Sequence, residues 1–199
     1  MTFQVDLIRH AESLDNCNPY ILGGRNASVP LSQLGEQQAA QLGREYTPDS
    51  NARLLSSPAV RAVRTGEIAF PSVDLVQDEC FYEIYHGEYE GQERASVYTP
   101  EEFQRMDLLD WSYRAPGGES WLEVADRMYE GINGYRGEAD SLVVISHITT
   151  IRALIGRMNG LSQQESFKTL NVPNTSISRV VDHGRGLKAE FTGMPADKI

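Results

Sequence analysis

Two histidines, each placed directly after an apolar stretch, are the residues of this chain best suited to nucleophilic or acid–base chemistry. His10 follows the run Val5–Ile8 and the basic Arg9, and His147 follows the run 142–145. An imidazole can act as a nucleophile, a base or a ligand, and a guanidinium has a planar fork that matches phosphate oxygens. An Arg-His pair alone is common on protein surfaces, so its meaning depends on what recurs downstream.

The segments before the two histidines are predicted to be strands of one sheet. Alternation of Phe3, Val5 and Leu7 with polar residues indicates a strand at about 3–9. Residues 142–145 are apolar on both faces, as in the interior of a parallel sheet. Since parallel strands end along one edge, where ligands bind in α/β proteins, we expect the two histidines to meet there.

Arg61 is the second basic residue with a favourable position. It lies early in a predicted helix, 59–70, which follows a brief strand at 53–56 and the dipeptide Ser57-Pro58. Helix N-termini supply free N–H groups and a positive dipole end, which favour an anion. We therefore expect Arg9 and Arg61 to surround one phosphoryl group together with the histidines, and we interpret Arg64 as a surface residue.

The remaining segments continue an alternation of strands and helices. A loop at 17–30 is rich in Asn, Gly and Pro, and an irregular aromatic segment runs through Tyr89. The predicted elements are a helix from the N-cap Ser32 to about 46, a strand at 73–76, helices at 100–109, 119–135 and 149–158, and hairpin strands near 176–182 and 187–191. This order predicts an α/β protein with three layers, α/β/α, and a largely parallel central sheet.

Composition is typical of a globular protein in a reducing compartment. The chain has 199 residues, of which 40% are apolar and 23% are charged, enough for one domain with a full core. No stretch approaches the ~20 apolar residues of a membrane span, and no signal peptide is recognisable at the N-terminus. Cys17 and Cys80 lack metal-like spacing and suit reduced thiols, so we expect a cytoplasmic location.

The net charge of −10 argues against nucleic acid or an anionic membrane as a partner. It does not exclude a small anionic substrate. Fifteen of the 18 basic residues are arginines, and a few of them in one pocket would outweigh the global field locally. Phosphate chemistry would therefore rest on a local cluster.

Six sequence motifs occur in a defined order. They are Arg9–Ser13 with Asn16; Pro30–Gly35; Ser57–Ala62 with Thr65; Glu83–Gly91; Pro116–Ser120; and Ile145–His147 with Ile151-Arg152. With these motifs, which cover roughly residues 3–180, the chain resembles the histidine phosphatase superfamily, also called the phosphoglycerate mutase-like family. The resemblance implies a phosphoglycerate mutase-like fold, a single domain over 1–199 and a lid or insert at about 80–116.

The same resemblance assigns roles to residues. His10 is expected to attack phosphorus and form a phosphohistidine, and Glu83 to serve as general acid and then as general base. The phosphate pocket would consist of Arg9, Arg61 and His147, and the substrate would face Asn16, Gly23 and Gly24. No metal and no cofactor are implied, and the partner is a small phosphorylated substrate.

Several readings remain open beside these roles. Glu79, Glu88 and Glu90 compete with Glu83, which is selected by its spacing to Gly87. His86 and His183 match no motif and are interpreted as solvent or hairpin residues. The Pro116–Ser120 element is either part of the site or only a turn and a helix cap.

Two departures from the family pattern concern the pocket. Ala11 stands where the family has Gly, which places a methyl group near the site. Ile148-Thr149-Thr150 replaces the common Gly-Gly after the second histidine, which narrows or re-lines the pocket. Neither change removes a catalytic group, and both leave the identity of the substrate open.

The segment between Gly91 and Pro116 favours a phosphatase over a mutase. Phosphoglycerate mutases of the family carry a longer, basic insert here, whereas this segment has 24 residues with only Arg94, Arg105 and Arg114 as basic side chains, and acidic residues outnumber them. The aromatic residues at 82–113 indicate either a substrate with a planar portion or packing of the lid.

A non-catalytic phosphate-binding protein is a third hypothesis. The presence of His10, Arg61, Glu83 and His147 argues against it.

Overall fold

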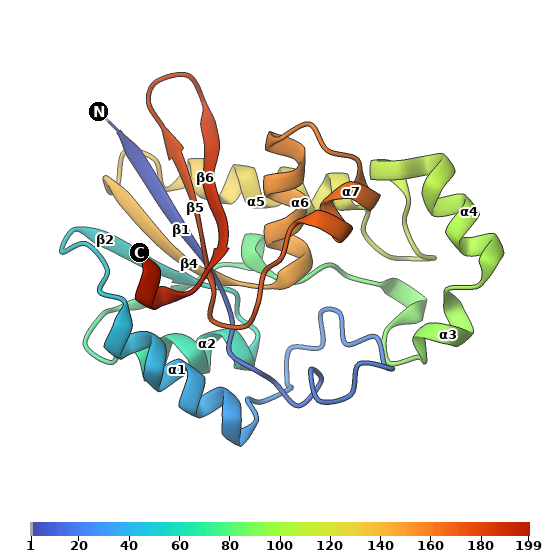
Figure 1. Cartoon of the computed structure of the whole chain (residues 1–199), viewed down its shortest axis with the longest axis horizontal. Helices are drawn as coiled ribbons and strands as arrows, with labels where there is room; N and C mark the ends of the chain where they lie inside the picture. Colours follow the sequence, from blue (N-terminus) through green and yellow to red (C-terminus); the bar gives the residue numbers. More distant parts are fainter. Residues whose placement is uncertain (1) are drawn as a thin grey trace.

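The structure, a computed structural model, describes residues 2–199 and is built on a single six-stranded sheet (Figure 1). The strand order is β3-β2-β4-β1-β5-β6. The pairs β3/β2, β2/β4 and β4/β1 are parallel, whereas β5 and β6 add antiparallel pairs at one side. The strands are β1 Phe3–Arg9, β2 Ala52–Ser56, β3 Leu75–Gln77, β4 Ser141–Ser146, β5 Ile177–Asp182 and β6 Leu187–Met194.

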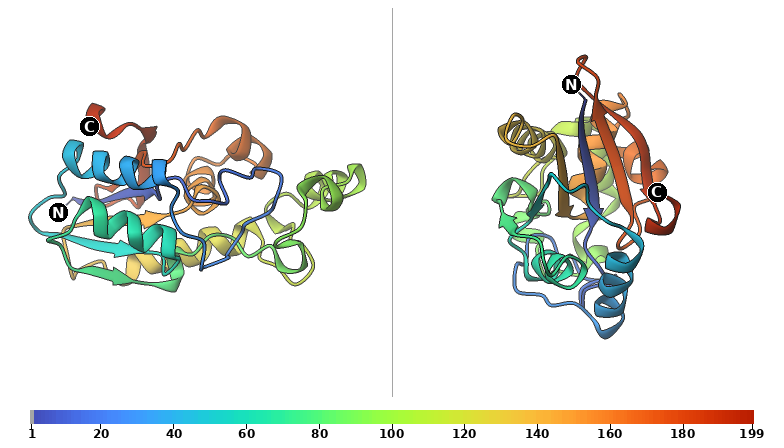
Figure 2. Two further views of the ribbon diagram at one scale, coloured as in Figure 1. Left: turned by 90° about the horizontal axis from the view of Figure 1, so that it is seen from below. Right: turned by 90° about the vertical axis from the view of Figure 1, so that its left-hand side faces the viewer.

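Helices cover both faces of the sheet, because alternate residues of its strands point to opposite sides. Val143 and Ile145 pack with the helices α1 (Gln33–Glu45) and α2 (Val60–Ala69). Leu142 and Val144 pack with α5 (Trp121–Gly134) and α6 (Ile148–Met158) on the other side. The two helical layers are visible in Figures 1 and 2. The predicted three-layer α/β/α class is therefore confirmed.

Helix caps explain where the helices begin. The Ser32 side chain accepts a hydrogen bond from the Gly35 N–H, as predicted for the N-cap of α1. Ser120 and Glu123 form a reciprocal capping box, so α5 begins at Trp121 and not at the predicted residue 119. Two short helices, α3 (Arg94–Val97) and α7 (Gln163–Thr169), were not predicted.

The segment after β3 combines a buried stretch with a projecting one. Phe81 and Ile84 belong to the core, close to the 3₁₀ turns η1 (Glu79–Phe81) and η2 (Gly87–Tyr89). Residues 94–112, here called the arm, comprise α3, α4 (Pro100–Leu109) and the turn η3 (Asp110–Ser112). The arm extends away from the sheet (Figure 2, left).

A buried carboxylate organises the arm. Glu102 accepts hydrogen bonds from the hydroxyls of Tyr113 at 2.5 Å and Tyr89 at 3.2 Å and forms an ion pair with Arg105 at 2.8 Å. Tyr98 packs against Phe103 with ring centroids 5.9 Å apart. Several of the aromatic residues that we noted in the sequence therefore pack within the arm itself.

Among residues 2–199, no helix combines the length and the apolar character needed to cross a bilayer.

Candidate active site

The ends of three neighbouring parallel strands bring the predicted site together. Arg9 of β1 lies opposite Ser146 of β4, and the N–H of His10 donates to the Ser146 carbonyl at 2.9 Å. On the other side of β4, the Ser57 N–H donates to the Ile145 carbonyl at 2.9 Å. The rings of His10 and His147 consequently meet edge to face, with centroids 5.0 Å apart.

His10 is oriented by the main chain. Its Nδ1 lies 2.7 Å from the carbonyl oxygen of Ala11, and the side chain is 3% exposed. A carbonyl only accepts, so Nδ1 carries the hydrogen and the lone pair of the neutral ring is on Nε2. Burial, and then the charges of Arg61 and Arg9, lower the pKa of His10 well below its usual value. The ring is therefore neutral at physiological pH, which is the form that can act as a nucleophile.

His147 is fully buried, and its Nε2 lies 2.8 Å from the hydroxyl oxygen of Ser57. Burial, and then the Arg61 charge, lower the pKa of His147 well below the usual value. Among residues 2–199, the buried side-chain atoms without a hydrogen-bond partner are Nδ1 of His147, Nε of Arg9 and Oγ of Ser13. Buried polar atoms are normally paired, so Nδ1 of His147, whose ring meets that of His10, is free to contact a polar ligand.

Arg61 is buried and Arg9 is partly buried, and backbone carbonyls hold both side chains. Arg9 donates to the Val172 carbonyl at 2.8 Å, whereas Arg61 donates to Asn26 at 2.6 Å and to Gly24 at 3.0 Å. Burial lowers the pKa of Arg9 to about 10, and burial also lowers the pKa of Arg61. Guanidinium groups in such a site favour an anionic ligand. Arg64 instead lies on the surface, where it pairs with Glu36 and Glu67, as predicted.

Glu83 is also buried, and the start of α6 holds its carboxylate. Oε1 accepts from the Ile84 N–H at 2.9 Å, and Oε2 accepts from the Thr149 N–H at 3.2 Å. The Thr150 hydroxyl lies 3.2 Å from Oε1 and 2.8 Å from the Tyr82 carbonyl. The departure at 148–150 therefore supplies groups that fix Glu83.

The methyl group of Ala11, expected near the site, is packed against other apolar side chains. Its N–H donates to the Thr65 hydroxyl at 3.0 Å, and its methyl group packs with Leu31 and Ala39. The methyl group that replaces a hydrogen of glycine thus joins a small apolar cluster between the first loop and α1.

Asn16, Gly23 and Gly24 belong to the loop between β1 and α1. The Asn16 side-chain oxygen accepts from the Ser13 N–H at 3.1 Å and from Asn174 at 3.2 Å. Gly24 has a φ of +51°, and a Cβ there would lie 2.3 Å from a Glu90 oxygen. The positive φ favours glycine there, and a Cβ would displace the Glu90 side chain. That these residues contact substrate stays a prediction.

Sequence reasoning missed several residues that support the site. Ser57 contacts His147, and the Asn174 side chain donates to the His10 carbonyl at 2.8 Å. Ser57 stood within a motif, whereas Asn174 follows no pattern. His86, interpreted from the sequence as a solvent residue, is instead half-buried, with Nδ1 3.5 Å from the Tyr98 hydroxyl. His183 lies exposed in the β5–β6 turn, as predicted.

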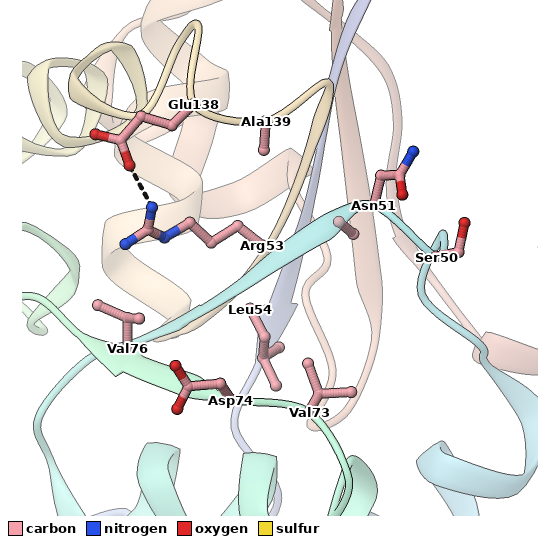
Figure 3. Close-up of a pocket in the computed structure, with 10 residues that line it drawn as sticks. Ser50, Asn51, Arg53, Leu54, Val73, Asp74, Val76, Glu138 and Ala139 are labelled. Atoms are coloured by element: carbon pink, nitrogen blue, oxygen red, sulfur yellow. Dashed lines mark hydrogen bonds and ion pairs between the residues drawn. The ribbon is translucent and has the colours of Figure 1, made fainter.

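A separate depression of about 320 Å³ lies at the opposite edge of the sheet (Figure 3). Residues near the starts of β2, β3 and β4 line it, among them Asn51, Asp74 and Ala139. Its arginine, Arg53, is paired with Glu138 and stacks on the Tyr135 ring with its guanidinium carbon 5.0 Å from the centroid. This engagement makes the depression a poor phosphate site.

Comparison with known proteins identifies the family of the chain. The family model of the histidine phosphatase superfamily (branch 1) matches residues 5–193. The chain belongs to the histidine phosphatase superfamily. Proteins similar to the chain are named as mutases and as phosphatases. The chain is an enzyme of this family.

The curated relatives of this histidine phosphatase include two bacterial proteins named "Probable phosphoglycerate mutase GpmB". The Proteus mirabilis protein is 31% identical over 183 residues, which cover 89% of this chain and 84% of the relative. The Erwinia tasmaniensis protein is 32% identical over 186 residues, which cover 90% and 85%.

Solved structures share the fold. Bacillus stearothermophilus YhfR superimposes with a TM-score of 0.84 at 22% identity and covers 96% of this chain and 97% of its own. A mycobacterial glucosyl-3-phosphoglycerate phosphatase reaches 0.82 at 19% identity, with 98% and 100% covered. These likenesses establish the phosphoglycerate mutase-like fold.

Proposed function

We propose that this enzyme hydrolyses phosphomonoesters of a small metabolite through a phosphohistidine on His10. The observation that carries the proposal is the state of His10. Its Nδ1–H is directed to the Ala11 carbonyl, so its Nε2 is left as the nucleophile, and burial together with the charges of Arg61 and Arg9 lowers the pKa of the ring.

In the first step, Nε2 of His10 attacks phosphorus and the bond from phosphorus to the alkoxide oxygen breaks. Glu83 gives its proton to the departing oxygen. Arg9 and Arg61 stabilise the negative charge on the equatorial oxygens. If the Ser57 hydroxyl donates to Nε2 of His147, the unpartnered Nδ1 carries a hydrogen that a phosphoryl oxygen can accept.

In the second step, water attacks the phosphohistidine while the Glu83 carboxylate takes its proton, releasing inorganic phosphate and neutral His10. Glu83 therefore acts first as an acid and then as a base. Thr150 suits this exchange, because its hydroxyl can donate to the ionised carboxylate or donate to Tyr82 while its oxygen accepts from the protonated one.

Hydrolysis is favoured over mutase chemistry by the contacts of the basic residues between Gly91 and Pro116. Arg94 donates to the Pro19 carbonyl at 2.9 Å, Arg105 pairs with Glu102 at 2.8 Å, and Arg114 pairs with Glu123 at 3.0 Å. All three cations of this segment are engaged, and a bisphosphorylated glycerate would need free ones. A mutase-type phosphotransferase remains the second candidate, because the curated relatives carry that name.

The proposal also covers cofactors, domain organisation, location and partners. The nucleophile, the acid and the anion-binding groups are all side chains of the chain, so the reaction needs no metal or cofactor. We further propose a single domain over 1–199 with residues 80–116 as a lid, a cytoplasmic location, and no nucleic-acid or membrane partner.

A comparison of products tests the choice between the two reactions. A panel of phosphomonoesters that includes both phosphoglycerates is incubated with the enzyme in the presence of a chelator. We expect release of inorganic phosphate with at least one small monoester and little exchange between the phosphoglycerates. Rapid exchange with little phosphate release would establish a mutase, and binding of phosphate with no turnover would establish the non-catalytic alternative.

A further inference from the structure

Glu119 forms the centre of an ion network beside the proposed acid. Its Oε2 accepts from Arg25 Nη2 at 2.7 Å, and its Oε1 accepts from Arg127 Nε at 3.0 Å. Oε2 also accepts from the Tyr85 N–H at 3.0 Å and from Arg127 Nη2 at 3.3 Å. The exposed fractions of the Glu119, Arg127 and Arg25 side chains are 21%, 17% and 33%, so the network is partly shielded from water.

Both arginines of the network reach the same main-chain atom. The Glu83 carbonyl oxygen accepts from Arg25 Nε at 3.3 Å and from Arg127 Nη2 at 3.1 Å. Arg127 also donates to the Cys80 carbonyl at 2.7 Å, and the Arg25 guanidinium carbon lies 5.3 Å from the centroid of the Tyr82 ring. The two guanidinium groups therefore connect the Glu119 carboxylate to the backbone of the residue that carries the acid.

The Pro116–Ser120 motif places Glu119 for this contact. The Glu119 N–H donates to the Tyr85 carbonyl at 2.8 Å, which pairs the two segments in both directions. A Cβ at Gly118 would lie 2.7 Å from the Tyr85 carbonyl oxygen, so the close approach requires glycine there. The motif is thus a turn and a helix cap, and it also delivers a carboxylate to the two arginines.

We propose that Glu119 is a positioning residue for Glu83 and acts through Arg25 and Arg127. The inference rests on the proposed role of Glu83 as general acid. Two cations held close together by one anion form a rigid bracket, and without that anion they repel each other and release the Glu83 main chain. Because misplacing a reacting group by about 1 Å can cost about 10²-fold in rate, loss of the bracket reduces proton transfer more than phosphate binding.

The Glu119→Gln variant tests the proposal. It keeps an acceptor for the Tyr85 N–H but removes the charge that holds both arginines. We expect phosphoenzyme formation from an alkyl phosphate to slow by about 10- to 100-fold, because the alkoxide needs a proton. This loss is smaller than the about 10²–10⁴-fold that acid assistance supplies, since Glu83 itself is retained. The same step with p-nitrophenyl phosphate, whose leaving group needs no proton, should change less than about threefold. Inhibition by inorganic phosphate should be unchanged.

Glu123→Gln is the matched control. Glu123 lies in the first turn of α5, the helix that follows Glu119. It completes the capping box and pairs with Arg114, and its hydrogen bonds and ion pairs do not include Arg25 or Arg127. It should lower the unfolding temperature without changing the ratio of rates for the two substrates. Arg127→Lys, which keeps the charge but lacks the fork, should reproduce the ratio seen in Glu119→Gln.

The outcomes separate this inference from the proposed function. If Glu83→Gln discriminates between the two leaving groups and Glu119→Gln does not, Glu119 has no positioning role while Glu83 remains the acid. If Glu83→Gln slows both substrates equally, the assignment of the acid fails and the role of Glu119 fails with it. A change of ratio in Glu123→Gln equal to that in Glu119→Gln would reduce the effect to helix stability and overturn the inference.

Discussion

At the scale of single residues, the site combines groups that are costly to bury with contacts that compensate for them. The Arg9 and Arg61 side chains are largely buried, and backbone carbonyls accept from both. Their charges help to keep His10 neutral. The residues proposed to bind the phosphoryl group thus also lower the pKa of the proposed nucleophile.

Glu83 provides the sharpest prediction at this scale. In Glu83→Gln, phosphoenzyme formation from an alkyl phosphate should fall by about 10²–10⁴-fold, because a basic alkoxide leaves without its proton. The effect with p-nitrophenyl phosphate should be much smaller. Rapid-quench experiments must separate this step from dephosphorylation, which should slow as well. Equal slowing with both substrates would direct attention to Glu88 or Glu90.

Arg61 provides a second prediction. Loss of one preorganised charged donor typically costs about 10²–10³-fold in rate, and we expect this loss in kcat/KM for Arg61→Ala. Arg61→Lys should recover only part of it, because an ammonium has no bidentate fork and cannot reach two carbonyls in the same geometry. Steady-state kinetics of the two variants check the prediction, and wild-type values in Arg61→Ala would refute it.

At the scale of elements, regular periodicity could be read from the sequence but irregular contacts could not. The strand β1 was predicted from the alternation of Phe3, Val5 and Leu7 with polar residues, and β4 from a run that is apolar on both faces. Helix α1 was predicted with Ser32 as its N-cap. The helices α3 and α7 have four and seven residues, too few for a helical repeat to show. The network of Arg25, Glu119 and Arg127 joins segments far apart in the chain, and no local pattern reveals such contacts.

The arm provides the prediction at this scale. Glu102→Ala removes the acceptor shared by Tyr89, Tyr113 and Arg105, which leaves buried hydroxyl groups unpaired. We expect faster amide hydrogen exchange in residues 94–112 with unchanged protection in the sheet. Exchange followed by mass spectrometry measures both regions at once. Unchanged protection in the arm would show that Glu102 does not organise it.

At the scale of the whole molecule, a strongly acidic protein concentrates cations at one edge of its sheet. The net charge of −10 does not exclude a small anionic substrate, because Arg9, Arg61 and Arg152 all lie near Glu83, and the charges of Arg152 and Arg61 act on Arg9. The net charge predicted from the sequence argues against nucleic acid or an anionic membrane as a partner. Only the topology of the sheet shows where Arg9 and Arg61 come together.

Stability should depend on pH through the buried histidines. Burial lowers the folded-state pKa of His10 and His147 below the unfolded value of about 6.5. Their neutral burial therefore contributes stability fully above that value, and the contribution is lost as pH falls below it. We expect the unfolding temperature to fall between pH 7.5 and 5.5, and to fall less in the double variant His10→Asn/His147→Asn. Parallel curves for the two proteins would contradict this origin.

The most direct test of the account is to trap the phosphoenzyme. Wild-type enzyme is mixed with a ³²P-labelled phosphomonoester that it turns over, quenched within milliseconds, and examined for protein-bound label. The account predicts a label that is lost in acid and retained in alkali, as for a phosphohistidine, and no label in a folded His10→Ala variant. Label that persists in His10→Ala would show that another residue takes the phosphoryl group and would contradict the central claim.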